Sequence, residues 1–321
     1  MRKLIFHIDV NSAYLSWEAA RRVAKGGAEL RLVPSAIGGD PEKRTGVILA
    51  KSIPAKKYKI TTGEPVAMAL RKCPELVLAK PDFKLYVQNS RAFIAICKKY
   101  APVVEQVSID ECFCDFDNTE LVYPDPLELA YRIKDEIKET LGFTVNVGIS
   151  ENKLLAKMAS DFEKPDKVHT LYPGEIPEKM WPLPVGELFT VGKATAERLR
   201  QARIETIGAL AHTDPEQLTR MFGPKLGSHL HRYANGISNS PVLAEPEEAK
   251  GYSISTTLED DVETAEAAYH ILLALADSVA ARLRADGFKA FCVAVTIRSN
   301  DFKNKSHQQK LRGPSDGTDD I

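Results

Sequence analysis

Two adjacent carboxylates interrupt an apolar strand pattern, and this constrains the fold more than any other feature of the chain. Residues 103–116 read VVEQVSIDECFCDF, in which Asp110 and Glu111 separate two runs rich in strand-forming residues. One explanation is a tight turn that leaves both acids in water. The other is a divalent-cation site, which needs crowded oxygen ligands and a cation to offset their repulsion. The choice depends on what lies beside the pair in space.

Strand and helix patterns alternate over residues 1–165, around an insertion at about 11–75 that is rich in Gly and Lys. Apolar periodicity predicts strands at 4–10, 103–109, 112–116 and 144–150. Helices are predicted at 84–99, from Asp125 or Pro126 to about Leu141, and from a Ser150 cap to Phe162. Without the insertion this order is β-α-β-β-α-β, the ferredoxin-like split βαβ fold.

This topology brings three carboxylates together. A right-handed crossover makes the first two strands parallel, so their carboxyl ends lie at one edge of the sheet. Asp9 is at the end of the first strand, and Asp110 and Glu111 follow the second. Three acids at one edge repel each other unless a cation is present. The pattern therefore favours a metal site over a solvated turn.

Residues 166–240 contain two helix–turn–helix patterns with a glycine–lysine turn. Gly192 and Lys193 form the first turn, and Gly223 and Lys225 belong to the second. Such turns place backbone N–H groups at a helix N-terminus, which suits a DNA phosphodiester. An ordinary αα-hairpin is the alternative.

A linker at 238–248 precedes a second α+β module. We expect strands at 251–261, 290–299 and 307–313, a helix at 263–285, and Thr318 or Asp319 as the N-cap of a further helix. Because the chain ends there, we expect a truncated module with an unpaired sheet edge. It would be loosely packed and sensitive to limited proteolysis.

Charge is unevenly distributed although the net charge is only −1. Residues 281–313 carry eight Lys or Arg against two acids, and 40–59 carry six against two. Lys303, Lys305, Lys310 and Arg312 are therefore candidates for phosphate contacts, with a merely solvated face as the alternative. The five cysteines show no metal-binding spacing and are interpreted as reduced, mostly buried thiols. Neither a membrane span nor a signal peptide is predicted.

Three segments carry a family resemblance. FHIDVNSAYLSWE, VEQVSIDECF and NVGISENKLLAKMASDFEKP resemble the Y-family translesion DNA polymerases of the polymerase IV type, the ImpB/MucB/SamB family. The resemblance implies a multidomain α+β fold. Its expected parts are a ferredoxin-like palm (1–10 and 76–165), inserted fingers (11–75), a helix–hairpin–helix thumb (166–237) and an incomplete little finger (249–321).

The resemblance also implies an activity and its site. A DNA-directed DNA polymerase of this family extends a primer–template with dNTPs, with low fidelity and no proofreading. Two Mg²⁺ ions would be held by Asp9, Asp110, Glu111 and the Val10 carbonyl. Tyr14 would be the steric gate against ribose, although it could simply pack beside Trp17, and Lys157 would reach the triphosphate. Lys153 is interpreted as solvated.

The start of the fingers helix, Asn11, Ser12 and Ala13, offers N–H groups to phosphate oxygens. Lys56 is a further nucleotide-binding candidate. It stands with Ile53 where many relatives have an arginine and a tyrosine, so it supplies charge without the bidentate fork. The alternatives are a catalytically weak or truncated DNA-binding paralogue and a palm-fold nucleotidyl cyclase. We expect a bacterial, cytoplasmic, nucleoid-associated monomer, which lacks the tail that binds a sliding clamp in relatives.

Overall fold

The computed structural model describes residues 3–40, 42, 46–245 and 248–321. Most of the chain up to residue 245 forms one compact unit, and residues 248–321 belong to a second, which is described separately. Lys43 and Arg44 of the basic segment, and residues 246–247 of the predicted linker, lie outside the described residues.

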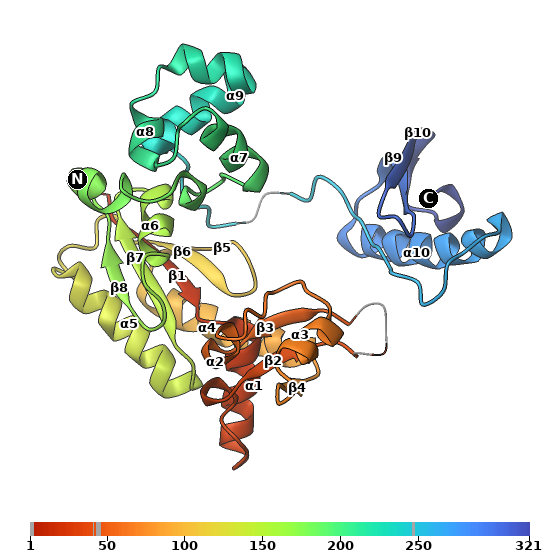
Figure 1. Ribbon diagram of the computed structural model, residues 1–321, viewed down its shortest axis with the longest axis horizontal. Helices are drawn as coiled ribbons and strands as arrows, with labels where there is room; N and C mark the ends of the chain where they lie inside the picture. Colours follow the sequence, from red (N-terminus) through yellow and green to blue (C-terminus); the bar gives the residue numbers. More distant parts are fainter. Residues whose placement is uncertain (1–2, 41, 43–45, 246–247) are drawn as a thin grey trace. The chain divides into compact units, whose positions relative to one another are not determined.

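A five-stranded sheet with the order β5-β6-β1-β7-β8 forms the centre of the first unit (Figure 1). Its strands are β1 (Ile5–Val10), β5 (Val103–Gln106), β6 (Glu111–Asp115), β7 (Val145–Ser150) and β8 (Val168–Thr170). β1 is antiparallel to β6 and β7, and β5 is antiparallel to β6, so β1 and β5 run in the same direction. The predicted split βαβ topology is confirmed. The fifth strand, β8, was not predicted, because three residues show no periodicity.

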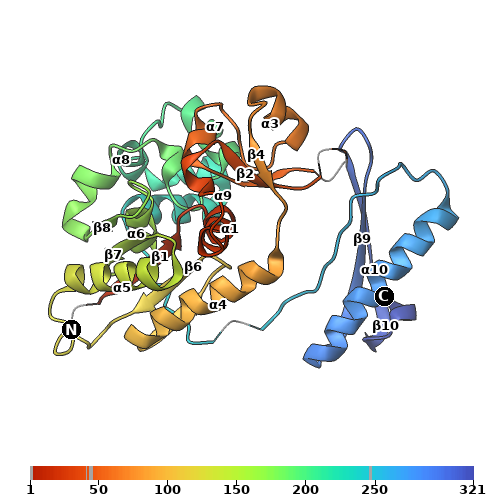
Figure 2. The same cartoon turned by 90° about the horizontal axis from the view of Figure 1, so that it is seen from below.

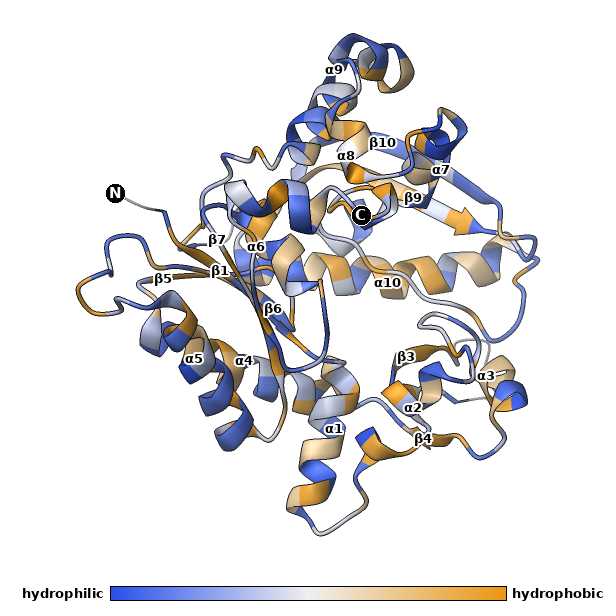
Figure 3. Ribbon diagram, turned by 60° about the vertical axis from the view of Figure 1, so that its left-hand side comes forward, coloured by the Kyte–Doolittle hydropathy of each residue, from blue (hydrophilic) through white to orange (hydrophobic). Residues whose placement is uncertain are grey.

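Side chains alternate between the two faces of this sheet. Phe6 and Cys114 belong to a core with α4 (Phe83–Tyr100) and α5 (Pro126–Leu141), which lie side by side on one face (Figure 2). Ile5 and Phe113 pack on the other face, against α6 (Lys153–Ser160). Figure 3 shows both hydrophobic and hydrophilic residues along α5, as expected for a helix with one buried face.

Two helix caps predicted from the sequence belong to the first unit. Asp125 caps α5 by accepting hydrogen bonds from the amides of Leu127 and Glu128, as predicted. The predicted Ser150 cap of α6 is wrong. Ser150 ends β7 and donates its hydroxyl to the Leu171 carbonyl, while the Asn152 side chain caps α6. The chain needs two more residues to leave the sheet before a helix can begin.

The insertion after β1 contains helices and a small sheet of its own. Its elements are α1 (Ala13–Ala24), η1 (Leu30–Leu32), β2 (Ser35–Gly38), β3 (Ile48–Lys51), α2 (Ile53–Lys56), α3 (Val66–Lys72) and β4 (Val77–Ala79). The sheet order is β3-β2-β4, with β2 antiparallel to β3 and parallel to β4.

Short helices follow β8 and build a second core. They are η2 (Pro173–Glu175), η3 (Ile176–Met180), η4 (Val185–Glu187), α7 (Lys193–Gln201), α8 (Ile207–Ala211) and α9 (Pro215–Ala234). Gly192 is the N-cap of α7. Gly223, with a φ of 81°, breaks α9 so that its second half begins at Pro224. Both predicted glycine turns therefore precede a helical segment. No described helix is long and apolar enough to cross a membrane.

The second unit contains α10 (Ala265–Asp286), the antiparallel pair β9 (Ala290–Arg298) and β10 (Asn304–Ser315), and η5 (Thr318–Asp320). The predicted strand at 251–261 is wrong. Within the described residues β9 pairs only with β10, so this segment joins no sheet. It contacts α10 instead, where Tyr252 donates to Asp286 and the Ser253 carbonyl accepts from Arg282. Gly317, rather than Thr318 or Asp319, precedes the final turn, which is a 3₁₀ helix.

Gly148 of β7 allows α6 to lie directly against the sheet, because a Cβ there would overlap the Ala156 carbonyl and the Ser160 amide. Gly148→Ala should therefore lower the free energy of unfolding by about 1–3 kcal/mol through overpacking. Urea denaturation measures this change. Gly174→Ala is the control, since a Cβ at Gly174 meets nothing within 4 Å, and its effect should stay within about 0.5 kcal/mol. Equal effects of the two substitutions would contradict this account of the packing.

Candidate active site

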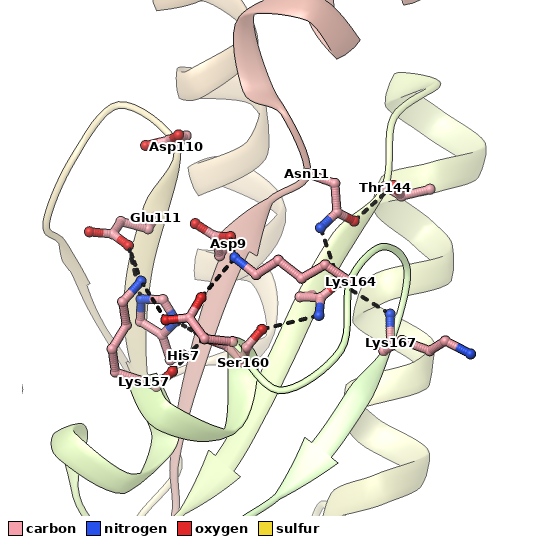
Figure 4. A network of polar contacts seen from close by, with 12 residues as sticks. His7, Asp9, Asn11, Asp110, Glu111, Thr144, Lys157, Ser160, Lys164 and Lys167 are labelled. Atoms are coloured by element: carbon pink, nitrogen blue, oxygen red, sulfur yellow. Dashed lines mark hydrogen bonds and ion pairs between the residues drawn. The ribbon is translucent and has the colours of Figure 1, made fainter. Parts of the chain in front are cut away.

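Three carboxylates lie together at one edge of the five-stranded sheet. Asp9 in β1 and Glu111 in β6 are direct partners in the antiparallel ladder. The amide of Val10 donates a hydrogen bond to the Asp110 carbonyl over 2.9 Å. Figure 4 shows the three side chains at this end of the strands. The convergence predicted from the topology is therefore present in the structure.

Glu111 is held by two partners, one from the adjacent strand β1 and one from helix α6. The ammonium of Lys157 in α6 lies 2.7 Å from its Oε2. Nε2 of the fully buried His7 lies 3.3 Å from the same oxygen. The contact with His7, followed by the charge of Lys157, lowers the pKa of Glu111 to about 2 despite the opposing effect of burial. Glu111 is therefore ionised at neutral pH.

Asp9 is paired with Lys164, from the loop that follows α6. The same ammonium lies 2.9 Å from Asp161. Neither Lys164 nor His7 was identified from the sequence. His7 alternates with core residues of β1 and gives no separate signal, while Lys164 belongs to the motif NVGISENKLLAKMASDFEKP without an assigned role.

Asp110 differs from the other two acids. Its Oδ1 accepts a hydrogen bond from the Ser108 hydroxyl at 2.6 Å, and it forms no ion pair with any residue that the structure describes. Burial, followed by the charges of Asp9 and Glu111, raises its pKa. Asp110 is therefore the member of the cluster that most lacks positive charge nearby.

A cavity of about 370 Å³ adjoins the carboxylates. Asp9, Val10 and Asp110 line one side, and the predicted nucleotide-binding residues Ser12, Ala13, Tyr14 and Lys56 line it too. Lys51, which was not predicted, contributes a second ammonium, and burial followed by the charge of Lys56 lowers its pKa. A site with acids at one end and lysines near the other suits a metal-bound phosphate ester.

Tyr14 both packs against other aromatic rings and lines the cavity, the two positions considered for it from the sequence. Its ring stacks on Tyr86 with centroids 4.5 Å apart, and it lies 5.9 Å from Trp17. It also lines the cavity and is only partly buried. The aromatic neighbours therefore hold a ring that faces the cavity.

The structure argues against Asn11 as a phosphate-binding residue. Its backbone N–H donates a hydrogen bond to the Thr144 carbonyl at 3.0 Å. Its side chain donates a hydrogen bond to Asn146 and accepts one from the Thr144 hydroxyl (Figure 4). Both groups are thus engaged in a buried network. Ser12, with a left-handed φ of 47°, then turns the chain into α1. Only Ser12 and Ala13 of the predicted trio reach the cavity.

The interpretation of Lys153 as solvated is also wrong. Its ammonium lies 2.7 Å from each carboxylate oxygen of Glu105 and 4.8 Å above the Phe113 ring. Lys153 therefore fixes α6 to the sheet one turn before Lys157.

The remaining DNA-binding candidates lie elsewhere. Gly223 and Lys225 line a groove of about 970 Å³ beside the second half of α9, together with His229 and Arg232. Gly192 and Lys193 begin α7 and are exposed. Lys305, Lys310 and Arg312 are exposed on β10 of the second unit, and Lys303 is exposed directly before this strand.

Comparisons with known proteins agree with this geometry. The impB/mucB/samB family model matches residues 8–161, its C-terminal domain matches 249–321, and the thumb domain of DNA polymerase iota matches 186–238. DNA polymerase IV of Clostridium acetobutylicum is 47% identical over 322 residues, which are 100% of this chain and 81% of the relative. DNA polymerase IV 1 of Bacillus subtilis is 38% identical, over 99% of this chain and 76% of the relative.

A solved chimeric Y-family DNA polymerase has the same fold, with a TM-score of 0.84 and 21% identity over 99% of this chain and 90% of that one. A sheet edge with three acids beside a cavity, followed by a helical domain and a further α+β module, defines a polymerase of the Y type. The chain belongs to the impB/mucB/samB family of Y-family DNA polymerases. The predicted family and multidomain α+β fold class are confirmed.

The unequal environments of the acids predict unequal effects on stability. Asp110→Asn should raise the thermal midpoint in EDTA by about 2 °C or more, the shift that roughly 1 kcal/mol produces in a domain of this size. The substitution removes a repelled charge and keeps an acceptor for Ser108. Asp9→Asn is the control, because it also removes the pair with Lys164 and should give no gain. Scanning fluorimetry measures both, and a lower midpoint for Asp110→Asn would contradict the assignment.

Proposed function

We propose that this chain transfers a nucleotidyl group from a dNTP to the 3′-hydroxyl of a primer, as directed by a DNA template. Synthesis would be error-prone and without proofreading. The observation that carries the proposal is the cavity shared by Asp9, Asp110 and Tyr14, which places acids, an aromatic ring and lysines around a space of nucleotide size. Membership of the Y family supports a role in synthesis across damaged templates.

We assign two divalent cations, Mg²⁺ in the cell, to Asp9, Asp110 and Glu111 with the Val10 carbonyl. The donors are all oxygen, which suits a hard cation. Asp110 supports the fit, because it is ionisable and half-buried and has no cationic partner among the described residues. When bound, such cations neutralise the triphosphate and activate the primer hydroxyl.

The lysines of the site would have two roles. Lys51 and Lys56 line the cavity and offer positive charge to the triphosphate. Lys157 forms an ion pair with Glu111, and Lys164 forms one with Asp9. Both can turn toward phosphate oxygens when cations take over the carboxylates. This is how Lys157 would reach the triphosphate, the role that the family resemblance implies for it.

The rest of the chain would hold the primer–template. We assign the palm to 1–10 and 80–170, the fingers to 11–79, the thumb to 171–237, the linker to 238–248 and the little finger to 249–321. The bounds expected at 76 and 166 shift because β4 pairs with β2 of the fingers and β8 pairs with β7 of the palm. The thumb model that matches 186–238 supports phosphodiester binding at the turns of Gly192 and Gly223. The exposed cations of β10 would add contacts that weaken as salt increases.

Primer extension on undamaged and abasic templates tests the proposed function. Asp9→Ala and Glu111→Ala should each reduce Mg²⁺-dependent extension by at least about 100-fold, since a bound cation supplies several kcal/mol of charge stabilisation. Glu128→Ala is the matched control, because Glu128 is an exposed acid on α5 that pairs only with Arg132 in this part of the structure. Near wild-type extension by either site variant would exclude the proposed centre.

Sugar selection tests the role of Tyr14. A ring held by Tyr86 beside the cavity would clash with a ribose 2′-hydroxyl, so Tyr14→Ala should reduce the preference for dNTPs over rNTPs by at least about tenfold, or 1.4 kcal/mol. Tyr14→Phe should keep the preference, as should Tyr131→Ala at an exposed tyrosine of α5. Ratios of kcat/KM for the two nucleotides provide the measurement. An unchanged ratio in Tyr14→Ala would leave Tyr14 as a packing residue only.

A further inference from the structure

Three cysteines meet in the core on the face of the five-stranded sheet that α4 and α5 cover. Cys112 and Cys114 are alternate residues of β6 and point to the same face, where Cys97 of α4 reaches them. The sulfur of Cys112 lies 3.8 Å from that of Cys97 and 3.9 Å from that of Cys114. All three sulfurs lie within 4.8 Å of one another, and all three residues are fully buried.

The spacing of these cysteines in the sequence shows no metal-binding motif, because strand geometry and a helix crossing bring them together. Cys112 and Cys114 share a face because the side chains of every second residue in a strand point to the same side. Cys97 lies 15 residues before Cys112, on the helix packed against that face. The remaining cysteines, Cys73 and Cys292, are outside the cluster.

The sulfur separations match those around a single bound ion. Three sulfurs at about 2.3 Å from one centre, the length of a Zn–S bond, are about 3.8 Å apart at tetrahedral angles and about 3.5 Å apart at the narrower angles, about 100°, around an ion with a lone pair. Two of the three separations are 3.8 Å and 3.9 Å, so a shift of a few tenths of an ångström brings these sulfurs to the spacing of such an ion. Soft ions prefer such thiolate ligands over oxygen.

The burial of the cluster determines which ionic charge the site favours. The cluster lies within the apolar core that includes Phe6, Ile8 and Phe93, and the hydrogen bonds of the three sulfurs in the described part of the chain join them only to one another. Burial raises the pKa of the Cys97 and Cys112 thiols, whereas the hydrogen bonds with Cys112 and Cys97 lower the pKa of the Cys114 thiol. Three thiolates around a divalent ion would leave one net negative charge in this core, which is costly. A trivalent ion leaves none.

We propose that Cys97, Cys112 and Cys114 form a binding site for a trivalent thiophilic ion of the arsenic(III) class. Arsenous acid, As(OH)₃, is the uncharged reactant. Three As–S bonds replace three As–O bonds, and each thiol proton leaves with a hydroxyl group, so three water molecules are released. No electrons are transferred, and the product is neutral. The site is independent of the proposed polymerase activity.

Arsenic binding to the full-length reduced protein tests this proposal. The protein is equilibrated with sodium arsenite and separated from free arsenic by gel filtration, and elemental analysis and native mass spectrometry count the bound atoms. We expect one arsenic per chain, with a mass gain of one arsenic less three hydrogens. We also expect a higher thermal midpoint with arsenite, because an ion that binds the folded chain stabilises it.

Matched variants assign the arsenic to the cluster. Cys97→Ala and Cys114→Ala should each weaken binding at least tenfold, and two variants are used in case one fails to fold cooperatively. The double variant Cys73→Ala/Cys292→Ser removes the other thiols and should bind like the native protein. Cd²⁺, the divalent comparison, should bind at least tenfold more weakly than arsenite.

Four results would overturn the proposal. The first is that no arsenic is found on the native protein, and the second is that Cys97→Ala and Cys114→Ala bind arsenic as tightly as the native protein does. The third is that arsenite lowers the thermal midpoint and the helical circular dichroism is lost. The fourth is that Cd²⁺ binds more tightly than arsenite. The last would show that a divalent soft ion, rather than a trivalent one, occupies the three sulfurs.

Discussion

Repulsion among Asp9, Asp110 and Glu111 is the interaction on which the rest of the site depends. The register of β1 and β6 makes two of these acids direct neighbours, and the amide of Val10 binds the backbone of the third. Lys157 and Lys164 neutralise two of them from α6 and the loop behind it. Asp110 accepts a hydrogen bond from the Ser108 hydroxyl and has no cationic partner among the described residues. A divalent cation at this edge would therefore reduce the repulsion among the three acids.

The position of α6 links this electrostatic balance to packing. Gly148 lets the helix lie against β7, and the pair of Lys153 with Glu105 anchors its first turn. Lys157 then follows one turn later on the same side and reaches Glu111. A network around Asn146 joins β7 to the loop that carries Lys164, through the carbonyls of Ser160 and Glu163 (Figure 4). The charges of the site are thus positioned by close packing, by the hydrogen bonds of Asn146 and by an ion pair that does not include the three acids.

Local patterns predicted the parts of the structure that depend on local physics. The strands of the main sheet and helices α4 and α5 follow from periodicity and capping, and the convergence of the acids follows from crossover handedness. Contacts between distant segments could not be predicted in this way. Asn11 turned out to bind Asn146 and Thr144, and Lys153 to bind Glu105, because sheet register decides which side chains meet. The strand expected at 251–261 failed for a related reason, since its hydrogen bonds go to Asp286 and Arg282 of α10 and not to the edge of a sheet.

Iron-dependent cleavage of the chain tests the central claim, that this edge binds divalent cations. Fe²⁺ replaces Mg²⁺ at such sites, and with ascorbate and peroxide it generates hydroxyl radicals that cut the backbone beside the bound ion. We expect cuts near residues 9–10 and 108–111, suppressed by excess Mg²⁺ and lost in Asp110→Ala. Cuts elsewhere, or cuts at these positions that neither Mg²⁺ nor the substitution reduces, would contradict the claim.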